Sequence, residues 1–364
     1  MLRSITITLG VLGAVLSSAA FAQDAIDPKL ADAWKFMQAN MPGVPYKLLE
    51  DACKEGTLTI YNGTWGEAQR SQVDAFKRRF PCMGVTTFEL GTGPRRERFV
   101  SETRAGRYTV DIVQDTDPGS LNEQADAGLL MKYAISNENS FEDAVKRTGY
   151  WYPLRIAVIG NAWNVDKVTP EEIKSLQDWK GVTNPAFKGR VAISDPSGGG
   201  ATFLPFYALY KLYGEDFMKK FAALEPRVFD NLNLLGSALA SGDVDVALAV
   251  SETPLTTMYI AGAPIQWSLP APGIGTANGQ AISAHAPHPN GAKLYQEYSF
   301  TEEGYAAWQK LGGPPARKDF KDRRDFASEK WYVYPHDFYS YDAAEVTNAK
   351  DSFMKKFNEW FKPK

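Results

Sequence analysis

Between Thr57 and Gln114 the chain alternates short apolar runs with longer segments whose apolar residues recur at helical spacing. Each run is rich in β-branched or aromatic residues, which is typical of a strand, and a polar or glycine-rich turn follows it. Strands that alternate with helices predict a parallel sheet covered by helices on both faces. In such sheets ligands bind beyond the carboxyl ends of the strands. We expect strands at 58–61, 85–90 and 110–114 and helices at 67–79 and 95–105.

A second α/β unit follows the change of pattern near Trp151. The apolar run 154–164 continues without a helix signal and is predicted to be a strand that crosses between two lobes. The segment 269–279 is rich in glycine and proline and is predicted to be the linker that returns to the first lobe. The other expected elements are a helix after Pro170, strands at 191–193 and 244–250, and helices at 201–213, 290–300 and 302–310.

The first 22 residues have the pattern of a secretory signal peptide, with Arg3, an apolar run at 5–16 and Ala20-Phe21-Ala22 before the predicted cleavage. The run is shorter than the roughly 20 residues that a membrane-spanning helix needs. Taking 22 residues from 364 leaves 342, or about two domains at roughly 150 residues each. Without Arg3, the 40 Lys and Arg become 39 against 43 Asp and Glu. The net charge of −4 argues against nucleic acid as the partner.

The chain has two cysteines, Cys53 and Cys82, each just before a predicted strand. Consecutive parallel strands begin side by side, and disulfides persist in exported proteins. A Cys53–Cys82 disulfide is therefore predicted ahead of two free thiols. A metal site on these residues is disfavoured, because neither has a second Cys or a His at ligand spacing.

Catalysis has little support in the sequence. A hydrolase needs a nucleophile with a positioned base, and the chain has three histidines, His285, His288 and His336. His285 and His288 lie three apart in a proline-broken loop and are predicted to be loop and helix-start residues. No Walker A, nucleophile-elbow, zinc-protease or dinucleotide-binding motif follows a strand in the required context.

The strongest candidate binding feature is the turn that follows the strand at 191–193. Its glycines let backbone N–H groups approach an anion at the start of the next helix, and its hydroxyl side chains add donors. Such a turn suits a carboxylate, phosphonate or phosphate, although a plain flexible loop has the same composition. Its candidate ligand-binding residues are Ser197, Gly198, Gly199 and Thr202.

Other turns carry side chains that suit a ligand. Trp65 at a loop tip would stack on a ligand or cap the core. Glu252 would accept a hydrogen bond from a ligand, or its negative charge would only interact favourably with the dipole of the helix that it begins. Arg155 on the crossing strand would neutralise a ligand anion or join a salt bridge. The further candidates are Thr64, Asp115, Thr116, Asn231, Ser251 and Thr253.

The aromatic-rich end at 331–341 combines tyrosines with His336. Ferric-ion binding and sugar stacking are two interpretations of this composition. We expect instead that it packs the end of the chain onto the body of the protein.

From about Gly56 to Arg317 the chain resembles one family. The most specific match is the passage 179–198, in which Trp179-Lys180-Gly181 is followed by the run 184–191 and by Asp195-Pro196-Ser197-Gly198. The segments 58–63, 105–113 and 288–305 match as well. They resemble the periplasmic solute-binding proteins of ABC importers, in the branch that includes ferric-ion, thiamine, polyamine and aminoethylphosphonate binders.

The resemblance implies a two-lobed α/β fold of the type II periplasmic binding protein class, with a doubly wound sheet in each lobe and a ligand cleft at the hinge. It implies that a small solute is captured in the periplasm and delivered to an inner-membrane ABC permease. We expect a monomer without cofactor or resident metal, whose first lobe is 23–155 plus 270–364 and whose second lobe is 156–269. By position, the resemblance assigns ligand contacts to Thr64, Trp65, Ser197, Gly198, Gly199, Thr202, Ser251, Glu252 and Thr253.

A departure from the family bears on the ligand. Ferric-binding members carry adjacent tyrosines near the strand end that Ser251-Glu252-Thr253 occupies here, whereas Tyr259 lies well into the following helix. Because ferric ion needs anionic oxygen ligands, an organic solute with an anionic group is expected ahead of iron. A ferric-ion-binding protein is the alternative within the family. A secreted hydrolase and a structural protein of the envelope are the alternatives outside it.

Overall fold

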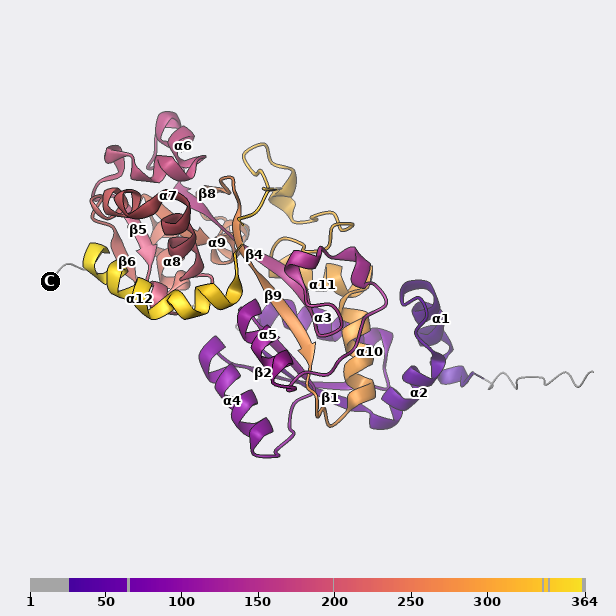
Figure 1. Cartoon of the computed structure of the whole chain (residues 1–364). Coiled ribbons are helices and arrows are strands. Elements are labelled where there is room, and N and C mark those ends of the chain that lie inside the picture. The colour runs from indigo at the N-terminus through magenta and orange to yellow at the C-terminus, as the bar shows by residue number, and fades with distance from the viewer. Residues whose placement is uncertain (1–25, 64–65, 199, 336, 340, 362–364) are drawn as a thin grey trace, which may run out of the picture.

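The computed structural model describes residues 26–361, apart from 64–65, 199, 336 and 340, so the predicted signal peptide lies outside the described residues. Two lobes are joined by two long strands, β4 and β9 (Figure 1). The strands are β1 (Thr57–Asn62), β2 (Gly84–Glu89), β3 (Ile112–Asp115), β4 (Trp151–Asn164), β5 (Val191–Ser194), β6 (Arg227–Phe229), β7 (Val246–Ser251), β8 (Ile265–Ser268) and β9 (Ile274–Ile282). The helices are α1 (Ala31–Asn40), α2 (Tyr46–Glu55), α3 (Gly66–Arg79), α4 (Thr92–Arg104), α5 (Pro118–Asp126), α6 (Pro170–Leu176), α7 (Leu204–Ala222), α8 (Leu232–Ser241), α9 (Glu252–Ile260), α10 (Pro289–Ser299), α11 (Glu302–Gly312) and α12 (Ala343–Phe361).

The strands form a mixed sheet in the order β2-β1-β3-β9-β4-β7-β5-β6, with β8 paired to β4. In the first lobe β1 pairs in parallel with β2 and β3, and in the second lobe β5 pairs in parallel with β6 and β7. The predicted strand–helix alternation is confirmed in both lobes. The long pair β4 and β9 is antiparallel, and it connects the two parallel sets.

The predicted linker at 269–279 is in large part the strand β9. Glycine and proline are typical of loops, which is why this segment was predicted to be a linker. In the structure β9 lies between β3 and β4, and hydrogen bonds to these two strands hold the backbone of β9 extended. Close packing also selects glycine here, because a Cβ on Gly279 would stand 2.4 Å from Leu121 and 2.8 Å from the Trp151 ring. The glycine content therefore reflects tight packing in a strand.

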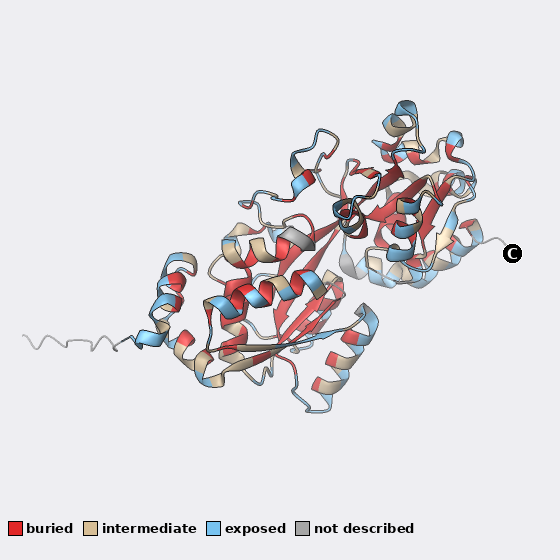
Figure 2. Cartoon of the chain, turned by 180° about the vertical axis from the view of Figure 1, so that it is seen from behind, coloured by how far each residue is buried: buried red, intermediate tan, exposed pale blue. Residues whose placement is uncertain are grey.

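Buried residues gather on the strands and on the helices that cover them in each lobe (Figure 2), and most of these residues are apolar. In the first lobe Ile60 and Ile112 pack with Phe76 of α3. In the second lobe Ile193 and Leu248 pack with residues of α7. The apolar runs and the helical-period segments seen in the sequence thus bury their apolar residues against one another.

The last helix, α12, corrects the expected division of the chain. Residues 270–364 were assigned as a whole to the first lobe, and no helix was predicted after 310. Phe353, Phe357 and Phe361 of α12 are instead buried in the core of the second lobe against α7. The helix forms because these aromatic residues recur at a spacing of four, which gives α12 one apolar face.

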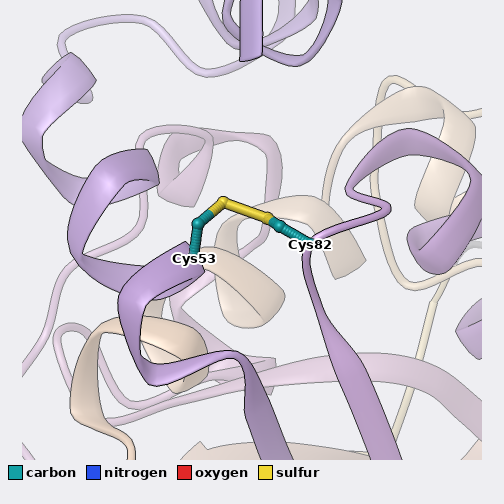
Figure 3. The surroundings of a disulfide bond; sticks show 2 residues. All are labelled: Cys53 and Cys82. Carbon is teal, nitrogen blue, oxygen red and sulfur yellow. A yellow bond between two sulfur atoms is a disulfide. The ribbon is translucent and has the colours of Figure 1, made fainter. Parts of the chain in front are cut away.

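The predicted disulfide is present. Cys53 near the end of α2 and Cys82 just before β2 are joined, with their Cα atoms 5.2 Å apart (Figure 3). The parallel pairing of Thr57 with Gly84 brings the two segments together. The bond therefore ties α2 to the start of the edge strand β2.

Candidate functional site

The turn after β3 in the first lobe approaches the turn after β5 in the second lobe. Thr116 follows β3 in the first lobe, and Gly200 belongs to the turn after β5 in the second. The Thr116 Oγ1 lies 3.4 Å from where a Cβ of Gly200 would stand, and Thr276 of β9 donates a hydrogen bond to the Thr116 carbonyl at 3.2 Å. The two turns that the sequence singled out from different lobes therefore meet.

The glycine-rich turn of the second lobe leads from β5 toward α7. The Ser197 N–H donates to Asp195 Oδ1 at 2.8 Å, which fixes the start of the turn, and the Ser197 side chain is exposed. Gly200 has φ +53°, which favours glycine at that position. Thr202 is half-buried at the end of the turn. Gly198 lies in a short 3-10 turn, and Gly199 lies outside the described residues.

Arg155 is buried at the centre of the molecule, on β4. Its Nη1 donates to Thr253 Oγ1 at 2.6 Å, and its Nε and Nη2 lie 2.8 and 2.9 Å from the side-chain oxygen of Asn278 on β9. Burial lowers the pKa of Arg155 to about 10, so the guanidinium stays charged at neutral pH. Arg155, Thr253 and the adjacent Ser251 form one polar group at the end of β7.

Glu252 is fully buried and is held by residues that the sequence did not single out. Arg324 Nη1 donates to Glu252 Oε1, and the Tyr332 hydroxyl donates to the same oxygen at 3.2 Å. Arg324 also contacts Asp322, through Nη2 at 2.6 Å. Burial alone would lower the pKa of Arg324, but Glu252 and Asp322 hold it above its ordinary value. Glu252 thus anchors the segment 322–332 at the start of α9.

Asp115 at the end of β3 is likewise buried and bound by arginines. Arg95 Nη2 lies 3.5 Å from Asp115 Oδ1, and Arg96 bridges Asp115 and Asp117 at 3.4 and 3.0 Å. Burial raises the pKa of Asp115, and the two arginines oppose that rise. Arg95 and Arg96 were missed because in the sequence they are ordinary basic residues of a helix.

Two of the candidates serve as helix caps, and two lie outside the described residues. Asn231 caps α8, because its side-chain oxygen accepts from the N–H groups of Asn233 and Leu234 at 3.0 and 2.9 Å. Ser251 caps α9 in the same way through the N–H of Thr253. Thr64 and Trp65 lie outside the described residues.

Several features have structural roles away from this site. His288 stands just before the first residue of α10, as predicted for a helix-start residue. Its backbone N–H and ring Nδ1 contact Asp111 at 2.7 and 3.0 Å. Trp331 and Tyr332 pack against Trp267, so this part of the chain end packs on the body as predicted. Tyr259 packs on the Trp267 ring as well.

A cavity of about 410 Å³ lies between α3 and α11. It is lined by Ala75, Arg78 and Arg79 of α3 and by Glu303 and Ala307 of α11, none of which is a residue of the turns described above. Among the described residues no cluster of three or more His, Cys, Asp or Glu side chains is arranged to hold a metal ion. Within the same part of the chain, no helix is both long and apolar enough to cross a membrane.

Comparison with known proteins decides the family. Residues 108–330, more than half of the chain, match the family of bacterial extracellular solute-binding proteins. The chain belongs to this family. A solute-binding protein of this kind is the substrate-binding component of an ABC importer, and it is not an enzyme. This finding removes the secreted hydrolase as an alternative.

The chain is also similar to individual proteins. An uncharacterized protein of Haemophilus influenzae is 26% identical over 314 residues, 81% of this chain and 88% of the relative. The fold is similar to that of iron-bound HitA from Pseudomonas aeruginosa, with 20% identity, a TM-score of 0.69, and 83% of this chain and 98% of HitA covered. It is also similar to that of AfuA from Actinobacillus pleuropneumoniae with fructose 6-phosphate bound, with 17% identity and a TM-score of 0.66. This match covers 85% of this chain and 100% of AfuA. The solute-binding protein therefore has the type II periplasmic binding fold.

Proposed function

We propose that this solute-binding protein captures a small organic solute with an anionic group, in the periplasm, between the turns of its two lobes. The observation that carries the proposal is the approach of Thr116 to Gly200, which places the turn after β3 against the glycine-rich turn before α7. A ligand bound there contacts both lobes at once. Closure around it then gives the permease a surface that the open protein lacks.

The donors at this place suit an anion. The turn 197–202 offers backbone N–H groups and the hydroxyls of Ser197 and Thr202 near the start of α7. The buried Arg155 adds a positive charge on the strand that joins the lobes. Hydrogen bonds between charged groups in a poorly solvated site are stronger than those between neutral groups. A carboxylate, phosphonate or phosphate ester fits this set.

The carboxylates at the strand ends are already engaged, which favours an organic ligand over ferric ion. Asp115 is bound by Arg95 and Arg96, and Glu252 is bound by Arg324. A hard cation requires several anionic oxygens. Tyr259 does not supply one, because it packs in an aromatic cluster. HitA is iron-bound, so iron is the alternative that the experiment must address.

Thermal-shift measurements test the ligand class. The protein is unfolded and refolded to remove retained solute and then screened with carboxylates, phosphonates, inorganic phosphate, fructose 6-phosphate, citrate and ferric citrate. We expect stabilisation by an organic anion, since a ligand at 100 times its Kd adds about 2.7 kcal/mol to the free energy of unfolding. Stabilisation by ferric citrate alone, with no response to citrate or the other anions, would overturn the proposal.

Two substitutions test the position of the site. Ser197→Ala and Thr202→Val are expected to weaken binding of the anion found in that screen about 10- to 100-fold, as expected for loss of a hydrogen bond to a charged group. Ser241→Ala and Thr183→Val remove hydroxyls elsewhere in the second lobe and serve as matched controls. Isothermal titration measures all four. Equal affinity in the four variants would place the site elsewhere.

The lobe boundaries and assembly belong to the same proposal. We place the hinge where β4 and β9 cross between the lobes, near Arg155 and near residue 270, with α12 as part of the second lobe. The chain acts as a monomer that docks onto the permease. Its first 22 residues direct export and are removed after Ala22.

A further inference from the structure

The start of α4, in the first lobe, carries the adjacent arginines Arg95 and Arg96. We propose that Arg96 and the backbone at the start of α4 form an anion subsite, the first-lobe subsite, and that the solute carries two anionic groups, one for each lobe. The group that the second lobe binds is taken from the proposed function. The first-lobe subsite is argued from the contacts of its own residues.

Arg96 lies where the two lobes approach each other. Its Nε donates to Asp115 Oδ2 at 3.4 Å, and its Nη2 donates to Asp117 Oδ2 at 3.0 Å. These two aspartates flank Thr116, whose Oγ1 is 3.4 Å from where a Cβ of Gly200 in the second lobe would stand. The Arg96 side chain is 37% exposed, so a solute can contact it. A solute held between the two turns therefore lies beside this guanidinium.

Arg96 is held in one orientation and has a donor left over. A guanidinium has five N–H donors on three nitrogens. The aspartates engage Nε and Nη2, whereas Nη1 makes no hydrogen bond to the described residues. Asp117 is itself fixed, because its Oδ1 accepts from the N–H groups of Gly119 and Ser120 at 3.0 and 3.4 Å. A charged donor that is already oriented binds an anion without the cost of ordering a flexible side chain.

The backbone at the start of α4 adds further donors. The N–H groups in the first turn of a helix have no acceptor inside the helix, and none of the described side chains caps α4. The Arg95 N–H donates to the Gly91 carbonyl at 2.9 Å, and Pro94 has no N–H. The N–H groups of Thr92 and Gly93 are therefore left for a ligand, at the positive end of the helix dipole. A Cβ on Gly93 would meet nothing within 4 Å, so the space beside this turn is open.

The polar groups that lack partners in this cluster are donors. Arg95 is 2% exposed, and its Nη2 has no hydrogen-bond partner among the described residues, although it lies 3.5 Å from Asp115 Oδ1. The four carboxylate oxygens of Asp115 and Asp117 each accept a hydrogen bond already. An anion therefore finds unused donors here, whereas a cation finds no unused carboxylate oxygen. A dicarboxylate or a phosphorylated carboxylic acid can place one group here and the other in the turn 197–202.

Nuclear magnetic resonance tests the first-lobe subsite on protein freed of solute by unfolding and refolding. With ¹⁵N in the glycines, the Gly93 amide reports this subsite and the Gly200 amide reports the second-lobe turn. Inorganic phosphate should shift the Gly93 signal saturably, and Arg96→Gln should weaken that binding at least about 10-fold, as expected for lost hydrogen bonds between charged groups. Malonate, succinate and glutarate differ in the spacing of their carboxylates. The best of them should shift both signals with one Kd, about 10-fold or more below that of acetate.

Arg98→Gln is the matched control, because it removes the same charge from the same helix away from the two aspartates. Arg98 instead donates to Glu102 at 3.0 Å and lies over the Phe88 ring. It should change the phosphate Kd less than about two-fold, since salt screens exposed charges. Unchanged signals of the other glycines show that both variants are folded. An equal loss of phosphate binding in the two variants would disprove the first-lobe subsite.

The two glycine signals separate this inference from the proposed function. A shift of Gly200 alone would disprove the first-lobe subsite and support the second-lobe site. A shift of Gly93 alone would leave the first-lobe subsite intact and count against the proposed function. If phosphate moves Gly93 but no dicarboxylate binds more tightly than acetate, the assignment of two anionic groups to the solute is wrong.

Discussion

Replacing Arg324 with alanine is expected to lower the free energy of unfolding by about 3–5 kcal/mol, because it leaves the carboxylate of Glu252 buried without its cation. Both side chains are shielded from solvent, with exposed fractions of 0% and 1%. The Tyr332 hydroxyl alone would then remain on Glu252, at 3.2 Å. Denaturant unfolding followed by tryptophan fluorescence measures the loss, with a second probe to establish that the two lobes unfold together.

The neighbouring Arg323 provides a matched control. It forms an ion pair with Glu302, but both side chains are more than half exposed. Exposed pairs contribute about 0–1 kcal/mol, so Arg323→Ala should have a small effect. Adding Glu252→Gln to Arg324→Ala should recover part of the loss, because the unpaired charge is then gone. A loss for Arg324→Ala no larger than that for Arg323→Ala would show that the buried pair does not stabilise the fold.

This ion pair shows which parts of the site a sequence can predict. The turn at 197–202 and the strand end at Glu252 were found because local composition and strand–helix alternation mark them. Arg324 lies 72 residues beyond Glu252, and no local pattern connects the two. Arg95 was missed for a related reason, because a basic residue in an amphipathic helix is ordinarily solvated, and only the fold brings it onto Asp115.

The fold was more predictable than the site, and two of its departures from the prediction have clear physical causes. The parallel strands follow from alternating patterns that each segment carries by itself. The strand β9 does not follow from its own sequence pattern, because the hydrogen bonds that hold it extended come from β3 and β4. The helix α12 has its own apolar period, with Phe353, Phe357 and Phe361 on one face. The aromatic run before it, at 331–341, has no such period, and no helix was predicted beyond residue 310.

Removing the disulfide is the second large effect that we expect. A double variant, Cys53→Ser and Cys82→Ser, should lose about 3–4 kcal/mol in the free energy of unfolding. The bond closes a loop of 29 residues, and the loss follows from the extra freedom of the unfolded chain without that closure. Because the chain has two cysteines, no second disulfide can replace this bond. Denaturant unfolding of both proteins measures the difference.

A reductant supplies the internal control for this prediction. Reduced unsubstituted protein should unfold at the same denaturant concentration as the double variant, and the double variant should not respond to reductant. The folded state should survive in both, because α2 also buries Leu48, Leu49 and Ala52 in the first-lobe core. If reduction leaves the unfolding midpoint of the unsubstituted protein unchanged, then the bond adds nothing to stability, and packing of α2 alone holds this edge of the lobe.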